Sequence, residues 1–214
     1  MFSASRPVDR TTPLWSSTYE RDSCGVGLVV DIAGRPSHEI VSRALAGLVN
    51  LTHRGGVGAD SRTGDGAGVL TQIPLGIFAE ELAAAGAGEV APGELGVMML
   101  FLPVDEAAAA TSRTALEDGL RSRGLEPLAW RVVPTDITAL GEQAIASMPR
   151  IEQLLTLRPA GMDEETFERE LFLARKAAVR ATQAAGIWDF FVASSSARTI
   201  IYKAFCLPRD LHLF

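Results

Sequence analysis

The feature that most constrains the fold is a cysteine at the head of a short apolar run. Cys24 stands in Asp22–Gly27, which reads Asp-Ser-Cys-Gly-Val-Gly, and a strand is predicted over Gly25–Asp31. If the bonds before Cys24 are cut, this residue carries a thiol together with a free α-amine, whose pKa of about 7.7–8.0 suits a base at neutral pH. Such a cysteine needs no separate histidine as its base. This chemistry therefore requires a fold in which the strand after Cys24 is the first element.

The next segment is predicted to be an amphipathic helix with a second motif at its end. Ser37 is a suitable N-cap, and apolar residues recur at helical spacing over 40–49, so the helix is expected to end near Thr52. His53–Gly56, which reads His-Arg-Gly-Gly, follows directly. The second motif therefore lies at the C-terminal end of the helix.

Several short motifs, in their order and spacing, closely resemble the start of the large subunit of glutamate synthase: Cys24–Leu28, Gly34–His38, His53–Gly56, Ala59–Asp60, Gly64–Gly68 and, later in the chain, Ser194–Lys203. In that family the segment opens the class II glutamine amidotransferase domain, and removal of a short propeptide exposes the nucleophile. The resemblance implies an α+β chain folded as a partial αββα N-terminal nucleophile hydrolase sandwich. Residues 1–23 would be a propeptide-like leader, and residues 24–214 would be the N-terminal part of the amidotransferase domain.

The resemblance also implies roles for individual residues. Cys24 would be the nucleophile, and Arg54 would lie beside it, where a positive charge favours the thiolate. Gly55, Asp65 and Gly66 would belong to the substrate pocket, where glycines let the backbone approach closely. A plainer alternative for Arg54 stays open, because a cation also suits the carbonyl groups at the end of a helix.

Other motif residues are expected to be structural. Gly64–Gly68 lacks the terminal Gly-Lys-Ser/Thr of a P-loop. It also precedes the strand predicted over Val69–Ile73, whereas a dinucleotide fingerprint follows a strand. A nucleotide-binding role is therefore not expected, His53 is expected to be a structural hydrogen-bonding residue, and Cys206 a bystander.

The middle of the chain, approximately residues 95–190, is predicted to be an additional α/β layer, which an alanine- and glycine-rich joint over 83–93 would connect to the first part. Its predicted strands are 96–102, 127–133 and 150–157, its predicted helices are 105–123 and 163–185, and the strands 190–195 and 199–202 follow. The charged residues of the second helix, Glu170 among them, are expected to form a solvated face opposite an apolar stripe.

One departure from the resembled family bears on activity. There, an Arg-Phe-Ser-Thr motif holds the substrate carboxylate and an Asn-Gly pair forms the oxyanion hole, and neither motif occurs in these 214 residues. Loss of one oxyanion donor costs about a hundred- to a thousandfold in rate, so we expect little activity from the chain alone. The remaining synthase domains or a separate polypeptide would complete the site. Two alternatives remain: a non-catalytic remnant or interaction module of the family, or another class II glutamine amidotransferase.

Composition limits the classes of partner and the cellular compartment that we expect. A net charge of −6 and a pI near 5.1 give no basic footprint for nucleic acid, and no apolar run is long enough to cross a membrane. Two cysteines make neither a disulfide framework nor a metal site, which favours a reducing, cytoplasmic setting. The resemblance implies L-glutamine as the substrate, with flavin mononucleotide and an iron–sulfur cluster in the full-length family enzyme and no cofactor in this chain.

Overall fold

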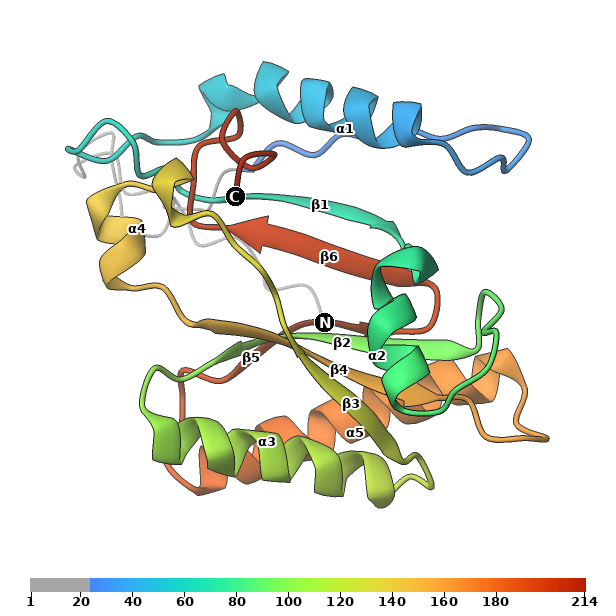
Figure 1. The fold of residues 1–214 in the computed structure, drawn as a ribbon. Coiled ribbons are helices and arrows are strands. Elements are labelled where there is room, and N and C mark those ends of the chain that lie inside the picture. The colour runs from blue at the N-terminus through green and yellow to red at the C-terminus, as the bar shows by residue number, and fades with distance from the viewer. Residues whose placement is uncertain (1–23) are drawn as a thin grey trace, which may run out of the picture.

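The computed structural model describes residues 24–214, and the predicted leader lies outside the described residues. In chain order the elements are α1 (His38–Asn50), η2 (Thr52–Arg54), β1 (Ala67–Gln72), η3 (Leu75–Phe78), α2 (Ala79–Ala84), β2 (Leu95–Leu102), α3 (Glu106–Arg121), β3 (Pro127–Val132), η4 (Ile137–Ala139), α4 (Glu142–Ala146), β4 (Arg150–Leu157), α5 (Glu164–Ala184), β5 (Phe191–Ser196) and β6 (Thr199–Ala204). They stack in four layers: α1, then the β1–β6 pair, then a second sheet, then α3 with α5 (Figure 1). The predicted αββα layering is confirmed.

The second sheet has the strand order β3-β4-β2-β5, and every neighbouring pair is antiparallel. Its strand β2 is buried on both faces because successive side chains point to opposite sides. Met98 and Leu100 pack toward the core shared with α3 and α5, whereas Val97 and Met99 belong to the core between the two sheets. The segment predicted as an additional layer thus supplies three strands of this sheet and both helices that cover it.

Both covering helices begin at an aspartate. The Asp105 side chain accepts a hydrogen bond from the Ala108 backbone N–H at 2.8 Å, and Asp163 accepts one from the Thr166 N–H at 2.7 Å. These bonds satisfy donors that a helix N-terminus leaves free. The hydrogen bonds from Thr166 also lower the pKa of the Asp163 carboxyl. The two N-caps therefore fix where the helices start beneath the sheet.

The charged face predicted for α5 is only partly solvated, and for Glu170 the expectation is wrong. Glu170 is 7% exposed, and its Oε2 lies 2.5 Å from Arg123 Nη2, beyond the end of α3. A second arginine, Arg169, lies 3.3 Å from the other carboxylate oxygen. Glu170 is buried because two cations compensate its charge.

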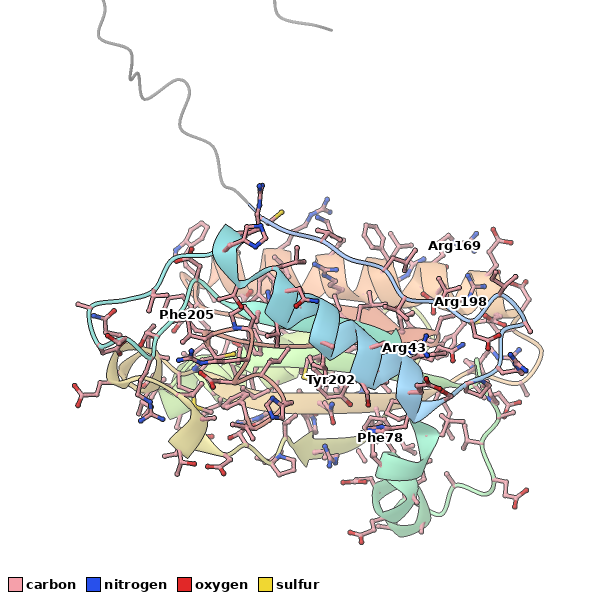
Figure 2. The ribbon with its side chains drawn as sticks, turned by 90° about the horizontal axis from the view of Figure 1, so that it is seen from above. Arg43, Phe78, Arg169, Arg198, Tyr202 and Phe205 are labelled. Carbon is pink, nitrogen blue, oxygen red and sulfur yellow. The ribbon has the colours of Figure 1, made fainter. Side chains whose placement is uncertain are left out.

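The other sheet contains β1 and β6, paired antiparallel from Ala67↔Ala204 to Gln72↔Thr199. Helix α1 lies over this pair, as the view from above shows (Figure 2). Ser37 is its N-cap as predicted, although the serine side chain makes no capping hydrogen bond, and no residue of α1 is fully buried. The helix that carries the His-Arg-Gly-Gly motif is therefore covered on one side only among the described residues.

The strand predicted over 25–31 does not form. These residues pair with no described strand, and the alternate side chains of Val26, Leu28, Val30 and Ile32 are 87%, 86%, 59% and 101% exposed. A strand needs a neighbour for its backbone hydrogen bonds as well as an apolar face. The segment is therefore an unpaired stretch that displays an apolar row.

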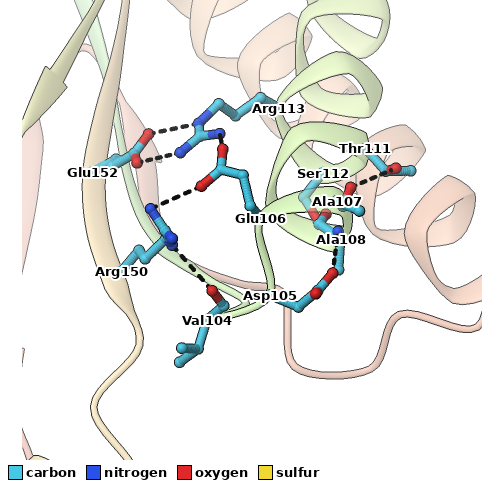
Figure 3. Close-up of polar contacts among 10 residues, drawn as sticks. All are labelled: Val104, Asp105, Glu106, Ala107, Ala108, Thr111, Ser112, Arg113, Arg150 and Glu152. Atoms are coloured by element: carbon cyan, nitrogen blue, oxygen red, sulfur yellow. Dashed lines mark hydrogen bonds and ion pairs between the residues drawn. The ribbon is translucent and has the colours of Figure 1, made fainter.

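Helix α3 is fastened to β4 by a charged network (Figure 3). Arg113 makes two bonds to Glu152, Nε to Oε2 at 2.9 Å and Nη2 to Oε1 at 2.6 Å, and a third to Glu106 at 3.0 Å. Arg150 reaches the other oxygen of Glu106 at 2.9 Å. The bidentate contact with Glu152 raises the pKa of the Arg113 guanidinium.

Replacement of Arg113 by methionine is expected to lower the free energy of unfolding by about 2 kcal/mol, because it leaves the buried Glu152 carboxylate without its charged donor. Arg121→Met is the matched control, since Arg121 on the same helix pairs only with more exposed carboxylates and should change stability by less than about 1 kcal/mol. Urea unfolding followed by circular dichroism measures both. Equal losses in the two variants would show that the Arg113–Glu152 contact contributes no more to the free energy of unfolding than the ion pairs of Arg121.

Candidate active site

Cys24 is exposed and leads directly into the unpaired stretch. The next residue, Gly25, packs tightly against the end of α1. A methyl group on Gly25 would lie 3.2 Å from Leu51 Cδ1 and 3.3 Å from Arg54 Cγ. The absence of a side chain at Gly25 therefore lets the backbone that follows Cys24 lie against the Arg54 side chain.

Arg54 ends the short η2 turn that continues α1. The Arg54 N–H donates to the Leu51 carbonyl at 2.8 Å, so the turn prolongs the helix by one more step. His53 Nδ1 lies 3.1 Å from the Asn50 carbonyl oxygen, which is the structural hydrogen bond expected of this histidine. A cation at this end of a helix is favoured by the backbone dipoles. The position suits both interpretations of Arg54, as a helix-end cation and as a neighbour of Cys24.

The loop after Arg54 is closed by Asp65. Val57 and Gly64 form an isolated antiparallel bridge, which brings Gly56 opposite Asp65. The Gly56 N–H donates to Asp65 Oδ2 at 2.5 Å, and a methyl group on Gly56 would lie 3.0 Å from Asp65 Oδ1. A methyl group on Gly55 would lie 3.9 Å from Asp65 Oδ2. Asp65 therefore holds the Arg-Gly-Gly loop close to the glycine-rich loop.

Inside this closed loop, Asp60 organises the turn. Its carboxylate accepts from the Thr63 N–H at 2.8 Å and the Thr63 hydroxyl at 2.5 Å. These hydrogen bonds lower the pKa of the Asp60 carboxyl well below its usual range. Gly141, the N-cap of α4, contacts Asp60 and Thr63 so closely that no side chain would fit there. No sequence pattern points to Gly141, because its partners Asp60 and Thr63 lie far away along the chain.

Two cavities lie between the sheets. The larger, about 530 Å³, is lined at one end by Asp65 and Gly66, while Cys24, Arg54 and Gly55 do not line it. Gly66 has a φ of +111°, which a residue with a side chain rarely adopts, so the glycine is required where the loop turns into β1. Of the predicted site residues, Asp65 and Gly66 thus line the larger cavity, and the Gly56–Asp65 hydrogen bond links them to the loop that follows Arg54.

The second cysteine lies behind this loop. Cys206 is fully buried, and a methyl group on Gly64 would lie 2.7 Å from its carbonyl oxygen. Burial raises the pKa of the Cys206 thiol to about 11. Cys206 therefore has the environment of an inert core residue.

This contrast predicts two very different thiols. At pH 8 only about one Cys206 in a thousand would be a thiolate, and the group is also inaccessible, so alkylation by iodoacetamide should be at least about a hundredfold slower than at the exposed Cys24. Peptide mapping by mass spectrometry at timed intervals measures both rates. The Cys24→Ala variant should lose the fast phase, whereas comparable rates at the two cysteines would contradict the buried environment of Cys206.

The residues present do not fit an iron–sulfur cluster. Such a cluster takes several cysteine thiolates, commonly four, and the chain has two cysteines. Within residues 24–214 no group of three or more histidine, cysteine, aspartate or glutamate side chains could hold a metal ion. Among the same residues, no helix is both long enough and apolar enough to span a membrane.

The model of the class-II glutamine amidotransferases matches residues 24–214 and thus begins at Cys24. The chain is 39% identical over 184 residues to ferredoxin-dependent glutamate synthase 2 of Synechocystis sp., covering 86% of this chain and 12% of that protein. It is 36% identical over 201 residues to the chloroplastic ferredoxin-dependent glutamate synthase of Oryza sativa subsp. japonica, covering 94% of this chain and 12% of that protein. It is 34% identical over 215 residues to the large chain of the NADPH glutamate synthase of Azospirillum brasilense, covering 100% of this chain and 14% of that protein. The chain therefore spans only a small part of the length of these relatives.

Proposed function

The chain belongs to the class-II glutamine amidotransferase family, and we propose that it is the N-terminal part of the glutaminase unit of a glutamate synthase-like enzyme. The proposed reaction hydrolyses L-glutamine to glutamate and ammonia for glutamate biosynthesis, in the reducing cytoplasm. Two observations carry the proposal: the family match begins at Cys24, and the backbone after Cys24 packs against Arg54.

In the proposed mechanism the Cys24 thiolate attacks the side-chain carbonyl carbon of glutamine. The thiol proton has passed to the α-amine of the same residue, which is free once residues 1–23 have been removed. The protonated α-amine then gives its proton to the amide nitrogen of the tetrahedral intermediate, which leaves as ammonia, and a γ-glutamyl thioester on Cys24 remains. Water then attacks the thioester, frees glutamate and restores the thiol.

The neighbouring residues serve this chemistry in different ways. The Arg54 side chain, which packs against the backbone at Gly25, would help to fix the position of Cys24. Asp65 acts as a positioning residue, because its bond to the Gly56 N–H fixes the loop that begins at Arg54. Gly55 and Gly66 leave room for substrate near the backbone.

The oxyanion donors are proposed to come from outside these residues. The 214 residues contain one asparagine, Asn50, and it is followed by Leu51, so there is no Asn-Gly pair to stabilise the developing oxyanion. Positioned donors of this kind account for about two to three orders of magnitude in rate each. The remaining synthase domains or a separate polypeptide would therefore complete the site, and the chain alone would be nearly inactive.

The experiment that tests the proposal is mass spectrometry of the purified protein after incubation with L-glutamine and an acid quench. The expected result is an N-terminus at Cys24 and a mass increase of one glutamyl group on the peptide that contains it. L-Asparagine, which is one methylene shorter, is the control and should leave no adduct. A chain that begins at Cys24 yet carries no adduct, even with a polypeptide supplying the Arg-Phe-Ser-Thr and Asn-Gly motifs, would refute the proposal.

A further inference from the structure

The inter-sheet space contains a lysine that forms no ion pair with any carboxylate of residues 24–214. Lys203 of β6 lines both cavities, and its Nζ lies 4.3 Å from the ring centre of Phe191 and 5.6 Å from that of Phe101. Within residues 24–214 no carboxylate forms an ion pair with this ammonium group. The two rings, 6.0 Å apart, hold the cation by their electron-rich faces. Lys203 is thus a fixed positive charge at the cavity wall.

The smaller cavity is the better setting for an anion. Its volume is about 340 Å³, and no acidic residue lines it, whereas Asp65 lines the larger one. The other strong cation at its wall, Arg131, is already paired, with Nε 3.0 Å from Glu81 Oε1 and Nη1 3.0 Å from Gln153 Oε1. Of the lysine and arginine side chains that line this cavity, Lys203 is therefore the one without a carboxylate partner among residues 24–214; His212 also lines it.

The rest of the lining is mostly apolar. It comes from both sheets and from the segments that close the ends, and includes Leu45, Val69, Met99, Val133, Ile151 and Phe214. Sites for small organic ligands combine such an apolar wall with a few placed polar groups and have volumes of about 300–1,000 Å³. A cation at an apolar wall is stabilised when an opposite charge accompanies it into the site.

We propose that the smaller inter-sheet cavity binds a monocarboxylate with a short apolar body, whose carboxylate pairs with Lys203 while its alkyl part contacts the apolar wall. One carboxylate matches the one ammonium group of Lys203, which favours this class over a dianion such as phosphate. The cavity is not lined by Cys24 or Arg54, so this site is separate from the proposed glutaminase chemistry.

The test compares two probes of the same size in isothermal titration calorimetry: octanoate, and octanamide, in which a neutral amide replaces the carboxylate. Octanoate should bind to the 214-residue chain about tenfold or more tightly than octanamide, as expected when a ligand gains one ion pair in a partly buried site. Inorganic phosphate should not compete. Equal affinity for acid and amide, or competition by phosphate, would overturn the proposal.

The chain offers a matched pair of variants, because Lys176 and Lys203 are its only lysines. Lys203→Met keeps an unbranched side chain but removes the charge, so the preference for acid over amide should disappear. Lys176 is exposed on α5, and Lys176→Met should keep the full preference.

A measurement on the unaltered chain decides the matter even if Lys203→Met does not fold. With selective ¹⁵N-lysine labelling, the two lysine amides give two signals, and octanoate should shift that of Lys203 while leaving that of Lys176 in place. Absence of a shift at Lys203, or equal shifts at both, would refute binding at this site.

Discussion

Replacement of Cys24 by alanine is expected to lower glutamine-dependent ammonia release by at least about a thousandfold. Without the thiol no γ-glutamyl thioester forms, and enzymes stripped of their nucleophile keep only the modest acceleration that binding and oxyanion donors provide. The assay adds a polypeptide that carries the Arg-Phe-Ser-Thr and Asn-Gly motifs, so that the loss is measured against a completed site.

Cys206→Ala is the matched control for this experiment. The second cysteine is buried, its pKa is raised to about 11, and it lies behind the glycine-rich loop, so its removal should leave ammonia release within about twofold. Cys24→Ser should fall between the two, because it keeps the α-amine base but replaces the thiol with a much weaker acid. If Cys24→Ala released ammonia at the rate of the unaltered chain, the nucleophile would have to be another group.

Elements with a strong local pattern were predicted correctly from the sequence. Strand β4 has the predicted bounds, Arg150–Leu157, and helix α5, Glu164–Ala184, differs from its prediction by one residue at each end. The aspartate that caps α5 and the apolar stripe along the helix are both properties of neighbouring residues. Predictions from these local patterns are correct here because the tertiary packing agrees with the local preference of the residues.

The prediction for residues 25–31 was wrong for a reason that local patterns cannot reveal. Alternating apolar side chains indicate that a segment has one apolar face, but they do not say which strand accepts its hydrogen bonds. Glu170 illustrates the same limit for charges. Its helical position suggested solvent exposure, whereas its buried contact is with Arg123, on a segment that sequence spacing does not connect to it.

For the candidate site, the sequence resemblance proposes residues but says nothing of their arrangement. The resemblance pointed to Cys24, Arg54 and Asp65, yet the contact of Gly25 with Arg54 depends on how α1 ends. The closed loop that lets Gly56 donate to Asp65 likewise required the three-dimensional structure. The inter-sheet cavities, which need both sheets in place, were not foreseen at all.

The stability of the four-stranded sheet is expected to depend heavily on one aromatic side chain. Phe167 of α5 is completely buried, and a methyl group on Gly96 of β2 would lie 2.9 Å from its Cζ. The ring therefore packs directly on the backbone of the central strand. Phe167→Ala would remove this contact and leave a cavity that the rigid sheet cannot fill, which should lower the free energy of unfolding by about 3–5 kcal/mol.

The same helix provides the control, because Phe172 is 51% exposed. Phe172→Ala makes the same chemical change with little burial and should cost less than about 1 kcal/mol. Urea midpoints of the two variants, measured with the slope of each transition, separate a loss of stability from a change in the unfolded state. Similar losses would mean that α5 is not anchored through Phe167. A large loss for Phe167 alone would make this ring the anchor of the sheet whose strand β2 carries Met99 and Phe101 into the smaller inter-sheet cavity.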